Sequence, residues 1–342
     1  MGSIFGKNIR VSIFGESHGA AIGCAIDGFP ASMAVDFAAL AAFMARRAPG
    51  ATAGSTPRRE ADAPEFLSGI ANGRTTGTPI AAIIRNSDQH SGDYAAIAST
   101  PRPGHADLAQ RMRYGDSCDL RGGGHASGRL TAPLCIAGGL ALQWLAQRGI
   151  SIAARIDAIH GHPIAGERDA SGLDAAARAE IETARAAGDS VGGTIACEIN
   201  GVPPGVGSPI FDGLENRIAA AVFGIPAVKG IEFGNGFEAA TLLGSENNDA
   251  FALDGEKVVT ATNRHGGILG GISSGMPITF RVAIKPTPSI AKAQRTVDVS
   301  KHEECEIRVP GRHDACIVPR AVPVVEAAAA IAVMDGVVVR CR

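Results

Sequence analysis

The order in which helix-like and strand-like segments follow one another is the feature that most constrains how this 342-residue chain can fold. Residues 9–14 are rich in β-prone side chains, and the runs "GGTIACEING" (192–201) and "MPITFRVAIK" (276–285) alternate apolar and polar residues, which is typical of strands. Helices are predicted at 35–47, 131–147, 173–187 and 321–336. Because helices and strands do not alternate regularly, the sequence predicts an α+β fold rather than a doubly wound sheet.

Local signals mark the ends of two of these helices. Asp36 is expected to cap the first helix, and Arg46 and Arg47 lie in its last turn, where a cation faces the negative end of the helix dipole. In the second helix, Pro133 is tolerated in the first turn, and Gly149 follows the C-terminal end.

The composition indicates a core built from small aliphatic side chains. Hydrophobic residues make up 45% of the chain but aromatic residues only 4%, so Ala, Val, Ile and Leu have to fill the interior. No repeat of fixed period and no long linker divides the chain, and we therefore expect residues 1–342 to form a single large domain. The formal net charge of −2 argues against a nucleic-acid partner, because such proteins usually carry a basic excess.

The cysteines and the N-terminal sequence indicate in which cell compartment the protein is expected. The seven cysteines are scattered without a Cys-x-x-Cys pair, which predicts buried, reduced thiols and neither a disulfide framework nor a metal site. The N-terminus lacks a signal-peptide pattern, and no uninterrupted run of about 18 apolar residues occurs. We expect a soluble, cytoplasmic protein with no membrane partner.

A polar, glycine-rich stretch runs from Arg102 to Arg129 and leads directly into the predicted helix at 131–147. Backbone N–H groups at a helix start attract anions, and glycines let those groups approach phosphate oxygens closely. Arg121 and Arg129 would add guanidinium groups that bind phosphate or carboxylate with two hydrogen bonds. The stretch is neither a Walker loop nor a dinucleotide fingerprint. It predicts an anion site, and the alternative is a glycine-rich hairpin with solvated arginines.

The motif "GESHG" places His18 at the end of the first predicted strand. A histidine there can exchange a proton near neutral pH, although a lone turn histidine is often structural. The same five residues match the Gly-x-Ser-x-Gly pattern of serine hydrolases, with Ser17 as the nucleophile. The helix that must follow such a nucleophile is missing, because "AAIGCAIDG" continues as a second strand.

Several further turns carry chemically useful side chains, each weak evidence by itself. "RPGHAD" presents Arg102 and His105 around a Pro-Gly turn, and "KPTPS" (285–289) is a rigid turn with an ammonium group and two hydroxyls. "GRHDAC" brings an arginine, a histidine and an aspartate together, and residues 263–275 form a second glycine-rich loop.

Taken together and in this order, these motifs resemble the chorismate synthase family. The matching pieces are "GESHG" with "IDGFP", then "RPGHAD", "RGGGHASGRLTA", "GGILGGISSG", "KPTPS" and "RHDACIVPRAVPVVEA", which span residues 15–327. The resemblance implies a helical core sandwiched between antiparallel β-sheets, a homotetramer, and a trans-1,4 elimination of phosphate. The expected substrate is 5-enolpyruvylshikimate 3-phosphate, the product is chorismate, and reduced FMN (FMNH2) is required without net redox change.

The resemblance also implies roles for individual residues. His18 would assist phosphate departure, His105 would protonate or hydrogen-bond the reduced flavin near N1, and Asp314 would act as acid or base with flavin N5. The substrate-facing arginines would be Arg47, Arg102, Arg129 and Arg312. The flavin contacts would be His125, Ala126, Ser127, Ala227, Gly270, Lys285, Pro286, Thr287, Pro288, Ser289 and Arg312.

The chain departs from the family pattern at a few positions. His125 and Ala126 stand where many members have Arg-Ser, Ala53 replaces a second common arginine, and Pro226 replaces an asparagine. We therefore expect activity with altered flavin affinity. No reductase segment is evident. We therefore expect reduced FMN to come from an external flavin reductase that uses NADP as its nicotinamide cofactor.

Two other functions remain open from sequence. One is a non-catalytic homologue that binds flavin or a phosphometabolite, which the changed flavin loop would favour. The other is a serine hydrolase using Ser17.

Overall fold

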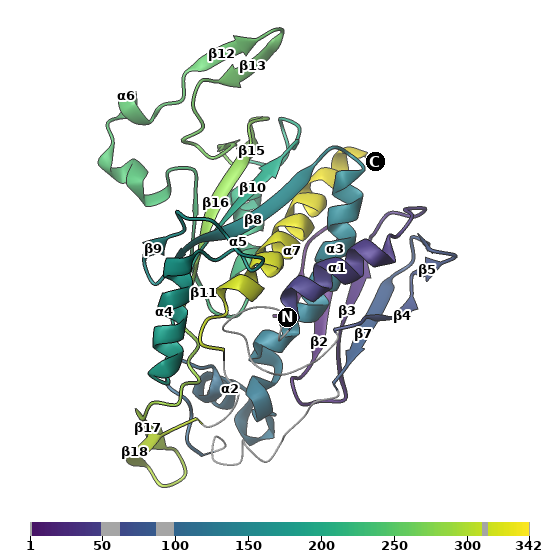
Figure 1. Cartoon of the computed structure of the whole chain (residues 1–342). Coiled ribbons are helices and arrows are strands. Elements are labelled where there is room, and N and C mark those ends of the chain that lie inside the picture. Colours follow the sequence, from purple (N-terminus) through teal and green to yellow (C-terminus); the bar gives the residue numbers. More distant parts are fainter. Residues whose placement is uncertain (1, 49–61, 87–98, 310–313, 342) are drawn as a thin grey trace.

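The computed structural model describes residues 2–48, 62–86, 99–309 and 314–341 (Figure 1). Its helices are α1 (Phe37–Arg47), α2 (Asp107–Tyr114), α3 (Thr131–Ala146), α4 (Ala175–Ala186), α5 (Leu214–Phe223), α6 (Gly244–Asn247) and α7 (Val318–Val337). The strands of the two large sheets are β1 (Ile4–Phe5), β2 (Arg10–Gly15), β3 (Ala21–Asp27), β4 (Glu65–Ser68), β7 (Ile80–Arg85), β8 (Ser151–Ile159), β9 (His162–Pro163), β10 (Gly193–Asn200), β11 (Val228–Phe233) and β16 (Ile278–Ile284).

Small hairpins complete the secondary structure. Their strands are β5 (Ile70–Ala71) with β6 (Arg74–Thr75), β12 (Phe251–Asp254) with β13 (Lys257–Thr260), β14 (Ile268–Leu269) with β15 (Ile272–Ser273), and β17 (Gln294–Asp298) with β18 (Glu303–Ile307). Two short 3-10 helices, η4 (Arg121–Ala126) and η5 (Gly128–Leu130), lead into α3.

The first large sheet has the strand order β1-β2-β3-β7-β4, with every neighbouring pair antiparallel. Every second residue of β3 is buried, namely Ile22, Cys24 and Ile26. Ile80, Ala82 and Ile84 repeat this pattern on β7. Since alternate side chains of a strand point to the same face, the sheet presents one apolar face to the helices.

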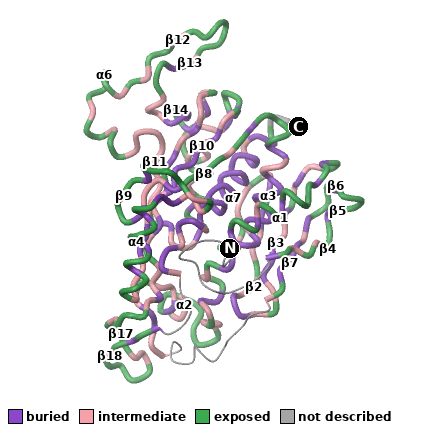
Figure 2. Tube along the Cα trace, in the orientation of Figure 1, coloured by how far each residue is buried: buried purple, intermediate pink, exposed green. Residues whose placement is uncertain are grey.

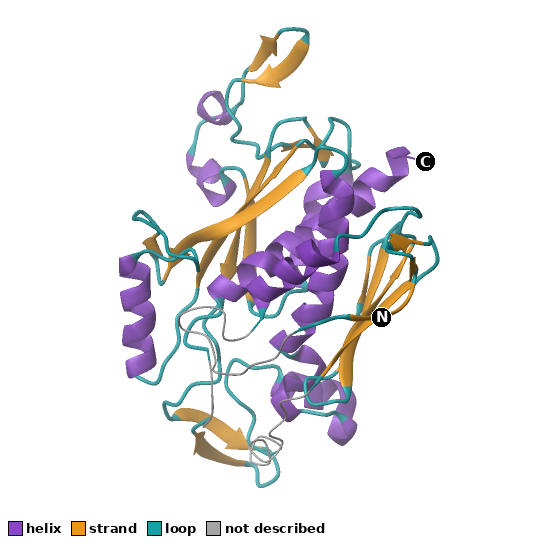
Figure 3. Cartoon of the chain, turned by 45° about the vertical axis from the view of Figure 1, so that its right-hand side comes forward, coloured by secondary structure: helices purple, strands orange, loops and turns teal. Residues whose placement is uncertain are grey.

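The second large sheet has the order β11-β16-β10-β8-β9 and is also antiparallel throughout. On β16 the buried residues again alternate, from Ile278 through Phe280 and Val282 to Ile284. The two sheets lie on opposite sides of a layer of helices, as the rotated view makes clear (Figure 3).

The middle layer consists of α1, α3 and α7, packed closely through small residues. A Cβ atom at Gly138 of α3 would lie 2.3 Å from the Ala327 Cα of α7, and one at Gly139 would lie 2.5 Å from Leu40 Cδ1 of α1. At Gly138, where the neighbouring atoms belong to the backbone and Cβ of Ala327, only glycine permits this approach. Helices α3 and α7 therefore approach each other closely through small side chains, as the low aromatic content of the chain predicts.

Helix α7 is buried along almost its whole length (Figure 2). Near its C-terminal end, the buried carboxylate of Asp335 accepts backbone N–H groups from Lys7 (3.0 Å), Asn8 (2.6 Å) and Ile9 (2.9 Å). Arg217 of α5 donates to the same carboxylate at 2.6 Å. This one side chain therefore ties the start of the chain to its end.

The fold agrees with most sequence expectations. The α+β class and the helical core between antiparallel sheets are confirmed. The helix expected at 35–47 is α1, with Asp36 accepting the Ala39 N–H at 2.9 Å, and the other three predicted helices are α3, α4 and α7. Helices α2, α5 and α6 were not predicted.

Two further features concern the surface. Within the described ranges, no helix combines the length and apolarity needed to cross a bilayer. The β12–β13 hairpin extends away from the body of the molecule, together with the segment that carries α6 (Figure 1). This arm, residues 236–260, exposes large apolar side chains, including Phe237, Phe251 and Leu253.

Candidate active site

A cavity of about 1210 Å³ opens where the ends of several elements converge. Its wall includes residues of β1 and β2, the turn before α2 and the η4–η5 segment, all from the N-terminal half of the chain. The C-terminal half contributes the end of α5, the 285–289 turn and the first half of α7. Elements far apart in sequence therefore surround one space, and the polar turns singled out from sequence form much of its wall.

The glycine-rich stretch passes between two histidines. A Cβ atom at Gly122 would lie 2.2 Å from His18 Cε1, and one at Gly123 would lie 2.9 Å from His105 Cε1. Both glycines have left-handed backbone angles, with φ of +59° and +90°. Glycine is therefore required at both positions for two reasons: the backbone conformation is left-handed, and an imidazole ring packs against the Cα atom.

His105 is held by a buried ion pair at the start of α2. The Asp107 carboxylate accepts Arg102 Nε and Nη2, each at 2.7 Å, and lies 2.6 Å from His105 Nδ1. Arg102 also donates to Ser289 Oγ at 3.0 Å. Although burial raises the pKa of Asp107, hydrogen bonds from Arg102 and His105 outweigh it and hold that pKa well below its usual range.

The tautomer of His105 follows from these contacts. Arg102 Nη2 lies 3.1 Å from His105 Nδ1 and would favour a deprotonated nitrogen, whereas the closer carboxylate requires a proton between the two atoms. We assign the proton to Nδ1, because a lone pair at 2.6 Å from a carboxylate oxygen would be repelled. His105 itself lines the cavity.

The 285–289 turn contributes a cationic wall. Lys285 Nζ donates to the Gly104 carbonyl, and Thr287, Pro288 and Ser289 line the cavity with it. Partial burial and the neighbouring Lys229 ammonium lower the pKa of Lys285. Two like charges are thus held together on one wall, which favours a bound anion.

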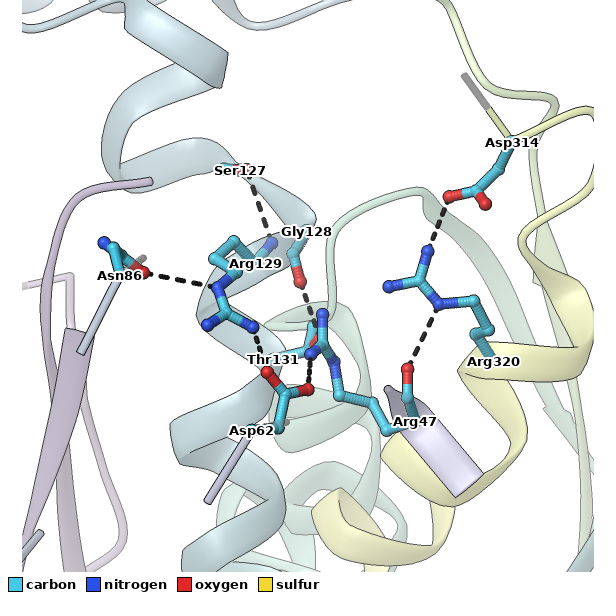
Figure 4. A network of polar contacts seen from close by, with 9 residues as sticks. All are labelled: Arg47, Asp62, Asn86, Ser127, Gly128, Arg129, Thr131, Asp314 and Arg320. Carbon is cyan, nitrogen blue, oxygen red and sulfur yellow. Dashed lines mark hydrogen bonds and ion pairs between the residues drawn. The ribbon is translucent and has the colours of Figure 1, made fainter. Parts of the chain in front are cut away.

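A second network of charged groups forms another part of the cavity wall (Figure 4). The buried carboxylate of Asp62 accepts Nη1 of both Arg47 and Arg129. Arg47 Nε also donates to Thr131 Oγ1 at 3.1 Å. Both arginines line the cavity, and Asp62 lies behind them.

Asp314 belongs to the same network. Arg320 Nη1 donates to Asp314 Oδ2 at 2.6 Å, and Arg320 Nε donates to the Arg47 carbonyl at 3.1 Å. Burial lowers the pKa of the Arg320 guanidinium, and the Asp314 carboxylate opposes that effect. The acid expected to handle a proton is therefore linked through Arg320 to an arginine expected to hold the substrate.

Most of the residues singled out from sequence meet at this cavity. Its lining includes Arg47, Arg102, His105, His125, Ala126, Ser127, Arg129, Ala227, Lys285, Thr287, Pro288, Ser289 and Asp314. His18 is buried behind Gly122, and its neighbour Ser17 reaches the cavity.

Two candidates do not line the cavity, and a third lies outside the described residues. Pro286 lines a smaller neighbouring pocket of about 330 Å³. Gly270 occupies the exposed β14–β15 turn and does not line the cavity in this chain. Arg312 lies outside the described residues, as do Ala53 and the nearby arginines at 58 and 59.

His125 bridges two parts of the N-terminal sheet. Its Nδ1 lies 2.8 Å from the Gly15 carbonyl, and its Nε2 lies 2.8 Å from Ser3 Oγ. A carbonyl can only accept, so Nδ1 donates and Nε2 accepts from the serine hydroxyl in the neutral ring. The side chain thus fastens β1 and β2 at the rim of the cavity.

One sequence expectation was wrong, and four contributors were missed. Arg121 does not join Arg129 in the cavity but pairs with Asp119 at 2.6 Å on the surface. Asp62, Asp107, Lys229 and Arg320 were not predicted. Asp107 and Arg320 lie inside motifs already quoted, whereas nothing in the polar sequence around Asp62 marks it.

Ser17 lacks the surroundings of a hydrolase nucleophile. The residues that follow it form β3 instead of a helix, and its N–H donates to the Gly124 carbonyl at 3.2 Å. A nucleophile elbow requires a strand–turn–helix unit, so the match to the hydrolase pattern is accidental.

Comparison with known proteins agrees with this geometry. A family model described as chorismate synthase matches residues 9–338. A chorismate synthase of Lancefieldella parvula is 47% identical over 365 aligned residues, covering 98% of this chain and 96% of that protein. One from Thermococcus kodakarensis is 47% identical over 341 residues, covering 96% of each.

A solved structure extends the match to three dimensions. A crystal structure of chorismate synthase superimposes with a TM-score of 0.75 at 27% sequence identity, covering 98% of this chain and 93% of that one. With the family model, the relatives and the solved fold in agreement along nearly its whole length, the chain belongs to the chorismate synthase family, whose enzymes are lyases of the shikimate pathway.

Proposed function

We propose that this chain converts 5-enolpyruvylshikimate 3-phosphate to chorismate and phosphate by trans-1,4 elimination, with reduced FMN as its cofactor. The observation that carries the proposal is the single cavity in which His105, Asp314 and four lining arginines meet: Arg47, Arg102, Arg129 and Arg320. The substrate carries a phosphate and two carboxylates, and desolvated guanidinium groups suit such anions because they stay charged when buried.

The residues present fit the flavin. At about 1210 Å³ the cavity exceeds the roughly 300–1,000 Å³ that is usual for a pocket holding one ligand, which supports a site that takes substrate and flavin together. One part of its lining is apolar, with Ile4, Phe5, Ile13 and Leu134, and another is cationic, with Lys229 and Lys285. An aromatic ring system suits the first part and a phosphate the second. When bound, reduced FMN supplies electron density to the substrate transiently and recovers it.

The chain's own groups have distinct tasks in this proposal. Arg47, Arg102 and Arg129, together with Arg312, bind and orient the substrate anions. His18 donates a proton toward the departing phosphate from its buried position beside Gly122. His105, with its proton fixed on Nδ1, presents its other ring edge toward Gly123 and the cavity. Asp314 accepts the ring proton.

The cofactor contacts are proposed on the same basis. His125, Ala126, Ser127, Ala227 and the 285–289 turn would surround the flavin. Gly270 belongs to this set only if another subunit brings it to the cavity. We propose a homotetramer, which the exposed apolar side chains of the 236–260 arm support, because isolated soluble chains rarely leave such patches uncovered.

Three further proposals concern the domain organisation, the source of reduced flavin and the cellular location. Residues 1–342 act as one domain, which the contiguous hydrophobic core from Ile9 to Val338 supports. Reduced flavin comes from a separate reductase that draws on a reduced nicotinamide such as NADPH. The protein works in the cytoplasm.

The test is an anaerobic assay with the purified protein, the substrate and chemically reduced FMN, in which phosphate release is followed. We expect turnover with reduced FMN and none with oxidised FMN. His105→Ala should lower kcat by about 10²-fold or more while leaving the fold and oligomeric state intact.

One outcome would contradict this function, and two others would contradict single parts of the proposal. Flavin binding without phosphate release would indicate a non-catalytic homologue. Wild-type rates for His105→Ala would remove that residue from the mechanism. Turnover with NADPH and oxidised FMN alone would reject only the external reductase.

A further inference from the structure

We propose that Asp62 is a positioning residue for the substrate: it holds Arg47 and Arg129 together behind the cavity, so that their guanidinium groups meet one anion. The inference rests on the proposed function and adds a residue that contacts neither substrate nor flavin. Asp62 immediately follows the undescribed segment 49–61 and precedes β4. It belongs to neither of the elements that carry the two arginines.

The two oxygens of the Asp62 carboxylate make matching contacts, one with Arg47 and one with Arg129. Asp62 Oδ2 accepts Arg47 Nη1, and Asp62 Oδ1 accepts Arg129 Nη1. Each guanidinium has a second anchor at Nε, which is Thr131 Oγ1 at 3.1 Å for Arg47 and Asn86 Oδ1 at 3.4 Å for Arg129. Two donors of each arginine are thus directed toward the protein, as Figure 4 shows.

Burial makes the carboxylate necessary. The side chains of Arg47 and Arg129 are only 4% and 7% exposed, and that of Asp62 is completely buried. Two guanidinium groups brought together out of water repel each other strongly, and a negative charge between them offsets that repulsion. Without Asp62, the arginines would separate or rotate toward solvent, and the shape of the anion site would be lost.

The arrangement extends to the proposed catalytic acid. Arg320 donates to the Arg47 carbonyl at 3.1 Å and to Asp314 at 2.6 Å. The backbone of Arg47 therefore anchors the arginine that holds Asp314, while its side chain is held by Asp62. A displacement of Arg47 would disturb substrate binding first and the position of Asp314 second.

Two effects of removing the carboxylate oppose each other. A more positive cavity attracts any anion more strongly, whereas misplaced guanidinium groups lose the paired hydrogen bonds that one bound anion can accept. The structure favours the loss of hydrogen bonds as the larger effect. Each of the two arginines has two anchors, and these anchors fix the positions of the guanidinium groups. The experiment must therefore separate the effect of removing the Asp62 charge from the effect of moving the two guanidinium groups.

The experiment compares Asp62→Asn, Asp62→Glu and Thr131→Val in the anaerobic phosphate-release assay with reduced FMN. Asp62→Asn should raise the KM for substrate at least about tenfold, with a smaller change in kcat and in the flavin Kd. Thr131→Val removes an anchor of Arg47, together with the hydrogen bond from the same hydroxyl to the Gly128 carbonyl, without changing any charge, and should raise KM by about threefold or more. Asp62→Glu should recover part of the loss.

Asp174→Asn is the matched control. Asp174 is also buried, and its carboxylate accepts the N–H groups of Ala165, Gly166 and Ala177 at the start of α4, away from the cavity lining. It should lose stability without any change in KM. Calorimetric titration of each protein with the substrate, in the presence of oxidised FMN, gives the binding constant independently of turnover and at a temperature where Asp62→Asn is folded.

The results separate the two proposals. If the wild type binds substrate but releases no phosphate, the proposed function fails while the binding comparison still tests Asp62. An unchanged or lowered KM and Kd in both Asp62→Asn and Thr131→Val would overturn the positioning role. It would leave Asp62 as an ion pair that only stabilises the fold.

Discussion

His105 Nδ1 lies 2.6 Å from Asp107, the same carboxylate that binds Arg102 through two nitrogens of its guanidinium group. One buried acid therefore orients both a proposed catalytic histidine and a proposed substrate-binding arginine. Because Asp107 is also the first residue of α2, its negative charge faces the positive end of the helix dipole. The sequence "RPGHAD" is thus a compact unit whose last residue holds the other two functional side chains in place.

Asp107→Asn should lower kcat by about 10–100-fold, the range seen when a metal-bound histidine loses its hydrogen-bonding partner, because His105 would lose the carboxylate that orients its ring. The amide can still fill the space but offers only one acceptor oxygen and no charge. The measurement is steady-state phosphate release across pH 6–9. Retention of wild-type kcat and of the wild-type pH profile would show that His105 does not depend on Asp107.

The same carboxylate should make stability depend on pH on the acid side. Its folded-state pKa lies below the unfolded value of about 3.9, so its contribution is complete above that value and is lost as pH falls below it. Urea unfolding of wild type and Asp107→Asn at pH 7 and pH 3 checks this. The difference in unfolding free energy between the two proteins should shrink at pH 3.

Gly122→Ala should destabilise the protein and disturb His18. The added methyl group would lie 2.2 Å from the His18 ring, in a backbone conformation with φ of +59° that alanine disfavours. We expect a loss of about 1–3 kcal/mol in unfolding free energy, together with a strong loss of turnover.

Gly115→Ala is the control for this clash. Gly115 also has a left-handed φ, of +68°, but nothing lies within 4 Å of the added methyl group. With ψ of −158°, Gly115 lies in a backbone region that almost only glycine occupies, so Gly115→Ala should lose about 1–3 kcal/mol through the backbone alone and keep its turnover. Equal losses of turnover in the two variants would mean that contact with His18 is not the cause.

His125→Ala should loosen the N-terminal sheet more than it weakens flavin binding. Its ring bridges Ser3 and Gly15, and two hydrogen bonds at a partly exposed site contribute about 1 kcal/mol together. Urea unfolding of His125→Ala, Ser3→Ala and the double variant forms a thermodynamic cycle that isolates the pair. Additive effects on stability, combined with a large fall in flavin affinity, would instead identify His125 as a direct flavin contact.

The cysteines should divide into two classes toward an alkylating reagent. Burial raises the pKa of the Cys24, Cys135 and Cys316 thiols to about 12, so they stay protonated and enclosed at pH 8. Cys118 and Cys305 are partly accessible and should react first with iodoacetamide, as mass spectrometry of peptides would show. Early labelling of Cys135 would indicate that the helical layer opens readily.

Sequence by itself determined the longest helices and the main strands of this protein and the family to which it belongs. The N-cap at Asp36, the glycine after α3 and the period-two strands follow from interactions within a few residues, so the chain displays them directly. The six motifs also identified most of the cavity wall, because a turn that carries several polar side chains between apolar segments has few structural uses.

Only the tertiary structure decided which charged groups pair. Asp62 meets Arg129 across 67 positions of sequence, and Arg102 meets Ser289 across 187, and no local pattern marks either contact. Arg121 and Arg129 look equivalent in the sequence, yet one pairs with Asp119 at the surface and the other faces the cavity. Buried ion pairs form where separate elements bring opposite charges together out of water, which is a property of the packed chain and not of any segment of it.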